Sequence, residues 1–154
     1  TNNFLILQAF FDSKDTRTYP CLIKALGGNF YTREFRRYVC DFLIQIGDPI
    51  VDLLIEAVRE KNADPSLRLY GAKILAAIGN PKAIPILASL LFDEWSDTNK
   101  VVEEGLLQFG RSAIEPLRKA LTAQDMDMRR GAAKTLERLN WQPETIEEKI
   151  KYFI

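Results

Sequence analysis

The chain has 154 residues, of which 47% are hydrophobic and 27% are charged, so it has the length and composition of one soluble globular domain. Its 21 basic and 21 acidic side chains cancel to a net charge of zero, which disfavours nucleic acid as a partner because no overall field attracts phosphate. The absence of histidine excludes Ser-His-Asp and Cys-His catalysis and histidine-based metal sites.

Helical patterns follow one another along the chain, and no strand pattern of alternating β-branched residues competes with them. The sequence predicts a first helix over residues 3–12 and a last helix over residues 143–153. Between them it predicts four helical hairpins near residues 18–46, 49–78, 81–109 and 112–139. The paired helices are expected at 18–27 with 32–46, 49–60 with 65–78, 81–92 with 97–109, and 112–122 with 126–139.

Recurring helix ends define these hairpins. Each second helix closes on an apolar residue followed by a helix-stopping one, namely Gly47, Gly79, Gly110 and Asn140, at spacings of 32, 31 and 30 residues. Such a period indicates a repeat architecture, in which each unit is one helical hairpin.

Aligning the units places a leucine at one position of every second helix, and these leucines are predicted to be buried: Leu43, Leu75, Leu106 and Leu136. A lone hairpin cannot cover its apolar stripe, so neighbouring hairpins must stack. We therefore predict an all-α fold, an α-α superhelix or α-solenoid of about four hairpins plus terminal helices, forming a single domain over residues 1–154.

The two cysteines, Cys21 and Cys40, lie in apolar helical stretches without close spacing, so both are expected to be buried free thiols. No window approaches the roughly 18 apolar residues that cross a bilayer, and no secretory leader is found. We expect a cytoplasmic protein without a membrane partner.

The chain opens on Thr1 rather than Met and ends on an apolar residue. Its last helix carries an apolar stripe of Ile146, Ile150 and Phe153, which is expected to pack on the preceding hairpin. Because terminal caps of solenoids normally present a polar outer face, we expect this chain to be a piece of a longer array.

The residues from Asp64 onward read D-P-x-L-R-x-x-x-A-x-x-L-x-x-I-G-N-P-x-A-I-P-x-L, and those from Asp125 onward read D-x-x-M-R-x-x-A-A-x-x-L. These patterns resemble the short HEAT-like repeats of the phycobilisome-lyase type. The unit at 96–109 departs from these patterns, because Asn99 stands where an arginine is expected and Glu103 where a small residue is expected. The resemblance implies a helical array that serves as a protein-binding scaffold. A subset of such proteins assists bilin attachment to phycobiliproteins, and a distant set comprises DNA glycosylases.

An arginine recurs at one repeat position, as Arg36, Arg68 and Arg129, and Asp64 and Asp125 stand four residues before the last two. Residues at i and i+4 meet on a helix face. The resemblance implies that such pairs join neighbouring repeats, so we expect a structural ladder, with a ligand site as the alternative.

The exposed side of the second helices is the usual recognition surface of a helical solenoid, because stacking lines these helices along the concave face. Aromatic and arginine side chains are what binding hot spots favour. The predicted protein-binding residues are Arg37, Tyr38, Asp41, Tyr70, Lys73, Lys100, Glu104, Arg130 and Lys134. An ordinary solvated face is the alternative for each of them.

The sequence contains no catalytic constellation, no set of metal ligands and no glycine-rich phosphate loop, so neither a metal nor a cofactor is expected. The leading hypothesis is a non-enzymatic scaffold that binds a protein or peptide on its concave face. The alternative is a bilin lyase or lyase-like subunit acting on phycobiliproteins. The oligomeric state stays open.

Overall fold

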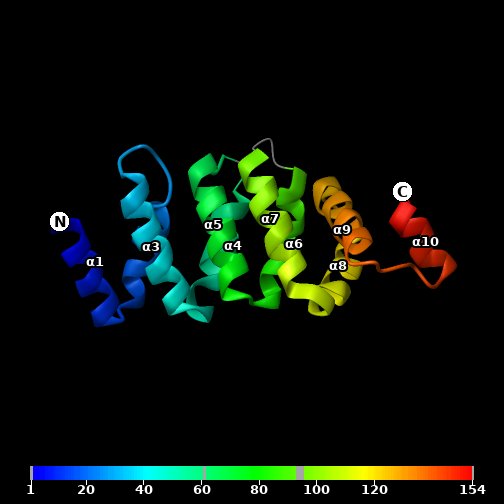
Figure 1. Ribbon diagram of the computed structural model, residues 1–154, viewed down its shortest axis with the longest axis horizontal. Helices are drawn as coiled ribbons and strands as arrows, with labels where there is room; N and C mark the ends of the chain where they lie inside the picture. The colour runs from blue at the N-terminus through cyan, green and yellow to red at the C-terminus, as the bar shows by residue number, and fades with distance from the viewer. Residues whose placement is uncertain (1, 61, 93–95, 154) are drawn as a thin grey trace. The chain divides into compact units, whose positions relative to one another are not determined.

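The computed structural model describes residues 2–60, 62–92 and 96–153, and every regular element in these ranges is an α-helix or a short 3-10 helix. The expected all-α class, built from helical hairpins, is therefore confirmed (Figure 1). The chain divides into two compact units, Thr1–Ile78 and Gly79–Ile154.

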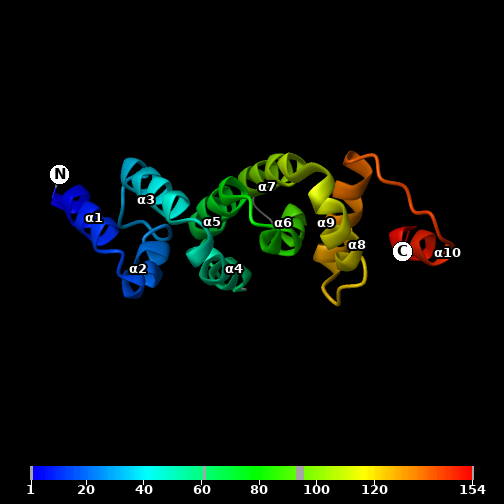
Figure 2. The ribbon, with the colours of Figure 1, turned by 90° about the horizontal axis from the view of Figure 1, so that it is seen from below.

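The first unit holds one helix followed by two hairpins. Helix α1 spans Asn2–Ser13, α2 (Tyr19–Lys24) pairs with α3 (Arg33–Ile46), and α4 (Val51–Arg59) pairs with α5 (Pro65–Ile78). Figure 2 shows the second helices α3 and α5 on one side of this unit and the first helices α2 and α4 on the other. The second helices therefore lie side by side, as stacking of repeats requires.

The second unit contains two further hairpins and a last helix. Helix α6 (Ile84–Ser89) pairs with α7 (Ser96–Phe109), α8 (Ile114–Ala120) pairs with α9 (Met126–Arg138), and α10 spans Ile146–Phe153. The first helices of both units are shorter than predicted because their opening turn is a 3-10 turn, at Asp48–Ile50, Pro81–Ala83 and Gly110–Ala113. Within this unit α9 packs closely on α6.

The repeated helix stops act through backbone conformation. Gly47, Gly79, Gly110 and Asn140 all have positive φ angles, of 75°, 74°, 56° and 58°. Glycine adopts this left-handed region without steric cost, and asparagine tolerates it better than most residues. The repeat period of the sequence therefore marks residues in the left-handed conformation, each of which ends a second helix.

The repeat leucines form the centre of each unit's core. Leu43 and Leu75 in the first unit and Leu106 and Leu136 in the second are all 0% exposed. Their predicted burial is confirmed, and it fixes the register of the four second helices.

Helix α1 is held on α3 by interlocked aromatic rings. Phe4 contacts Phe35 and Tyr38 with ring centroids 6.1 and 4.6 Å apart, and Phe11 stacks on Phe42 at 5.0 Å. Phe4 and Phe11 are seven residues apart, as are Phe35 and Phe42, so each pair lies on one helix face. These contacts make α1 an integral part of the first unit.

The expected packing of the last helix is wrong for the two stripe residues that can be checked. Ile146 is 77% exposed and Ile150 is 54% exposed, and the side chain of Phe153 lies outside the described part. Among the described side chains, a charged contact joins this helix to α8, because the Arg118 guanidinium donates to the Glu148 carboxylate. The same contact, as its main cause, lowers the pKa of Glu148.

The last helix also begins three residues later than predicted. Thr145 precedes it, and its hydroxyl oxygen accepts a hydrogen bond from the Glu148 backbone N–H at 3.1 Å. The Glu148 carboxylate accepts in return from the backbone N–H of Thr145 at 3.4 Å. This reciprocal arrangement is a capping box, whose Thr-x-x-Glu pattern is readable in the sequence.

No helix in residues 2–60, 62–92 or 96–153 combines the length and the apolar character needed to cross a membrane.

Candidate functional site

The charged members of the predicted binding set, seven residues on the second helices, form the candidate binding surface, and we call these seven the inner row. In the first unit they are Arg37 and Asp41 on α3 and Lys73 on α5, and all three side chains are exposed. Arg37 and Asp41 are one helical turn apart, and α3 packs directly against α5. The inner row of this unit is thus a short charged surface spanning two adjacent helices.

In the second unit the inner row consists of Lys100 and Glu104 on α7 and Arg130 and Lys134 on α9, all exposed. An ion pair between Glu103 of α7 and Arg138 of α9 ties these two helices together. The row therefore lies on helices whose spacing is fixed by a direct contact.

The inner row contains an alternation of charge that follows the repeat. Asp41, Lys73, Glu104 and Lys134 each stand two residues before the buried repeat leucine, so they occupy equivalent positions. In each unit an acidic residue on the first of the two second helices is matched by a lysine on the next. The sequence could have revealed this alternation through the leucine alignment alone.

The buried thiol of Cys40 lies near enough to Asp41 and Lys73 for both charges of the row to act on it. The pKa of its thiol is raised from 9.0 to about 12, mainly by burial and also by the Asp41 carboxylate, while the Lys73 ammonium acts in the opposite direction. Both charges therefore act on one buried thiol, which is consistent with their lying on adjoining helices. Cys21, in contrast, is exposed, so the expectation that both thiols are buried is wrong for Cys21. The short helix α2 turns the neighbouring Leu22 and Ile23 inward instead.

The two thiols should react differently. At neutral pH we expect a maleimide to modify Cys21 alone, and Cys21→Ser should abolish the labelling of the folded chain. Because the folded pKa of Cys40 is raised, its contribution to stability is complete below about pH 9 and is lost as the pH rises towards 12. Denaturant unfolding across this window should therefore show a steeper loss of stability for the parent chain than for Cys40→Ala. Equal slopes would contradict the buried environment of Cys40.

Two predicted binding residues have a different environment from that expected. Tyr38 is half-buried, with its ring against Phe4 of α1 and Phe42 of its own helix at 4.6 and 4.8 Å. Tyr70 is only 9% exposed, and the Lys73 ammonium lies 5.4 Å from its ring centre. The equivalent residue in α9 is Gly131, which lies directly against α6. This repeat position faces a neighbouring helix, so the tyrosines contribute more to packing than to an open surface.

The recurring arginines bind the loops of their own hairpins. Arg36 donates to the backbone carbonyl of Gly28, Arg68 donates to that of Glu60 at 3.0 Å, and Arg129 donates to Ala123 at 2.6 Å. Each acceptor lies in the loop that joins the two helices of the same hairpin. We call this contact the arginine clamp.

The aspartates of the expected ladder cap the second helices. Asp64 accepts from the backbone N–H of Ser66 at 2.8 Å, and Asp125 accepts from that of Asp127 at 2.8 Å. These are N-cap hydrogen bonds, which satisfy donors that the first helical turn leaves open. A link to the neighbouring repeat exists in the first unit, where Gly27 lies so close that a Cβ there would be 3.3 Å from the Asp64 Cβ.

We expect Arg129→Met to destabilise the second unit by about 1 to 3 kcal/mol, because it keeps much of the aliphatic stem but removes the charged donors to the loop carbonyls. Chemical denaturation would measure the loss. Lys134→Met, an exposed change on the same helix, should stay within about 0.5 kcal/mol of the parent chain. Equal effects of the two substitutions would contradict the clamp.

Comparisons with known proteins agree with this architecture. The family model for HEAT repeats matches residues 20–107, which is more than half of the chain. A solved structure described as the complex of CpcE and CpcF of phycocyanin lyase from Nostoc sp. PCC7120 contains a chain with a TM-score of 0.55 and 16% sequence identity, covering 90% of this chain and 98% of that one. None of the curated proteins matches the sequence. At this identity the structural likeness shows the fold alone, whereas the match of the family model shows that this chain belongs to the HEAT repeat family.

Proposed function

We propose that the chain is a non-enzymatic interaction module whose inner row binds an acidic segment of another protein. HEAT repeats as a family support the general role of a protein-binding scaffold. The charge of the inner row supports the more specific proposal that the bound segment is acidic. Five of its seven residues are basic, Arg37, Lys73, Lys100, Arg130 and Lys134, and two are acidic, Asp41 and Glu104, in a chain whose net charge is zero.

The exposure of these residues carries the proposal. All seven are exposed, while apolar residues of the same helices, such as Val39, Ile74 and Val102, are buried in the cores of the two units. Basic side chains on a fixed helical scaffold attract an anionic partner and set its orientation, and they contribute more to the association rate than to affinity. Within each unit, a peptide segment with several carboxylates complements this charge better than a folded apolar partner does.

A synthetic glutamate-rich peptide labelled with a fluorophore tests the proposal through fluorescence anisotropy. Lys73→Glu and Lys134→Glu should each weaken binding about 2- to 10-fold, because each reverses one exposed charge at the row. Asp41→Lys should strengthen it, since it adds a cation beside Arg37. Binding should also weaken as salt is raised.

Lys119→Glu is the matched control. Lys119 is exposed on α8, which is a first helix, and the substitution changes the net charge by the same amount as Lys73→Glu or Lys134→Glu does. If Lys119→Glu weakens peptide binding as much as Lys73→Glu and Lys134→Glu do, the attraction depends on net charge alone and the inner row is not the binding site. A lysine-rich peptide that binds equally well would also exclude the proposal.

A second candidate function has one observation in its favour. The matching solved structure is described as part of a phycocyanin lyase, so the alternative of a bilin lyase or lyase-like subunit is retained. Incubation of the chain with a bilin and a phycobiliprotein subunit should then yield a covalent coloured product. Absence of that product, both with the chain alone and with an added partner lyase subunit, would leave the interaction module as the function.

A further inference from the structure

A mainly apolar pocket lies in the first unit, and none of its lining residues belongs to the inner row. It has a volume of about 210 Å³, and helices α1, α2 and α3 all contribute to its lining. Its apolar lining includes Leu7, Phe10, Phe11, Leu22 and Phe42. Ligand pockets are typically apolar with a small number of polar groups that orient the ligand.

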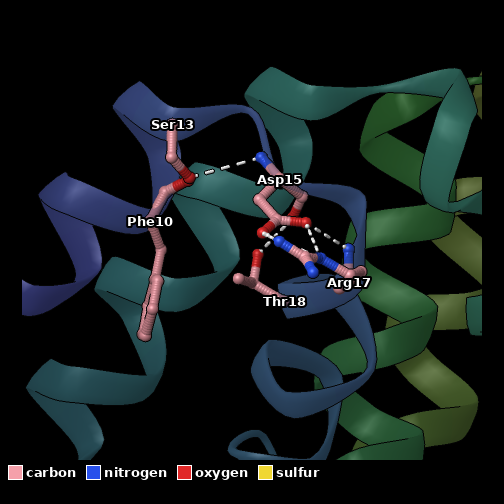
Figure 3. A network of polar contacts seen from close by, with 5 residues as sticks. All are labelled: Phe10, Ser13, Asp15, Arg17 and Thr18. Atoms are coloured by element: carbon pink, nitrogen blue, oxygen red, sulfur yellow. Dashed lines mark hydrogen bonds and ion pairs between the residues drawn. The ribbon is translucent and has the colours of Figure 1, made fainter.

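The turn between α1 and α2 contributes Lys14 to the lining of this pocket and is held by polar contacts (Figure 3). The Ser13 hydroxyl donates to the Phe10 carbonyl at 2.8 Å and accepts from the Asp15 N–H at 3.3 Å. The Thr18 hydroxyl donates to the Asp15 carbonyl at 2.7 Å, and the Asp15 carboxylate pairs with Arg17 at 2.7 Å. Because these contacts fix the turn, the backbone position of Lys14 is set before any ligand arrives.

Lys14 supplies the charge of the pocket. It is the one charged residue in the lining, and its backbone lies in the left-handed region with a φ of 50°. Within the described part of the chain its ammonium has no ion-pair partner, since the neighbouring Asp15 is already paired with Arg17. Gln45 adds a neutral amide to the lining. The charge at the pocket is therefore complementary to an anion.

The volume limits the size of the ligand. A cavity of about 150 Å³ holds benzene, and pockets for drug-sized molecules run from about 300 Å³ upward. At about 210 Å³ this pocket is suited to a body of one ring or a short alkyl chain and is too small to enclose a tetrapyrrole. The stacked rings of Phe11 and Phe42, 5.0 Å apart, favour an aromatic body.

We propose that this pocket binds a small amphipathic carboxylate, with its ring against the Phe10, Phe11 and Phe42 side chains and its carboxylate at Lys14. The site shares no residue with the inner row. Binding at the pocket adds a small-molecule ligand to a chain whose proposed partner is a protein.

The probe is 3-phenylpropionate, followed by saturation-transfer NMR and calorimetric titration on the full chain, with the neutral 3-phenylpropionamide as its matched ligand. The carboxylate should bind saturably and about 2- to 5-fold more tightly than the amide, the range for an exposed ion pair. Lys14→Gln should remove that preference and leave the amide unchanged. Phe10→Ala, at a partly exposed wall residue, should weaken both ligands about 5-fold or more.

Lys119→Gln in the second unit is the control and should change neither ligand. Lys73→Glu should leave 3-phenylpropionate bound as before, and Lys14→Gln should leave the glutamate-rich peptide bound as before, so failure of one proposal is distinguishable from failure of the other. The pocket proposal is overturned by any of three results: no saturable binding of either ligand, an amide that binds as tightly as the carboxylate, or Phe10→Ala without effect.

Discussion

Gly131→Ala should destabilise the second unit by about 2 kcal/mol or more, as expected for overpacking a filled interface. A Cβ at this position would lie 1.8 Å from the backbone carbonyl oxygen of Ala88 in α6. No side-chain rotation relieves that overlap, because the obstructing atom belongs to the backbone. Helix α9 would have to move away from α6. Denaturant unfolding, followed by circular dichroism, measures the change.

Gly71→Ala in the first unit is the informative comparison. Its added Cβ would meet the Val58 Cγ2 atom at 2.6 Å, which is a side-chain atom rather than backbone. The double variant Gly71→Ala with Val58→Ala should therefore show a favourable coupling between the two sites. If Gly131→Ala instead gains the roughly 1 kcal/mol that alanine offers over glycine in a helix, the close approach of α9 to α6 is wrong.

Leu75→Ala should cost about 2 to 5 kcal/mol, the usual range for a core leucine. Leu75 is 0% exposed in α5 and occupies the repeat position that all four second helices share. Truncation leaves a cavity that the surrounding helices fill only in part. Thermal or denaturant unfolding gives the cost, and Lys73→Ala, an exposed change two residues away, should stay within about 0.5 kcal/mol. A loss below about 1 kcal/mol for Leu75→Ala would mean that the register of the repeat is wrong.

Local features of the fold were readable from the sequence because each depends on one or two residues. The left-handed stops at Gly47, Gly79 and Gly110 and the buried leucines, such as Leu43, follow from residue type and period. The capping box at Thr145 is equally local, but the predicted start of the last helix, at Pro143, lies three residues before its observed start at Ile146.

Features that depend on neighbouring helices could not be derived in the same way. The helical period places Tyr38 and Tyr70 just off the buried stripe, but α1 covers the ring of Tyr38 through Phe4. The arginine contacts with loop carbonyls also need the folded hairpin, because the guanidinium reaches a loop residue eight positions earlier, as Arg68 does at Glu60. The pocket at Lys14 needs three helices and therefore has no signature in any one segment.

Amide chemical-shift mapping locates the peptide on the chain and so tests binding at the inner row. A ¹⁵N-labelled chain titrated with the glutamate-rich peptide should show its largest shifts at the inner row, around Arg37 and Lys73 in the first unit and Lys134 in the second. Amides of the first helices α4 and α8 should shift little. Shifts concentrated on α4 and α8, with the amides of the inner row unchanged, would contradict binding at the inner row.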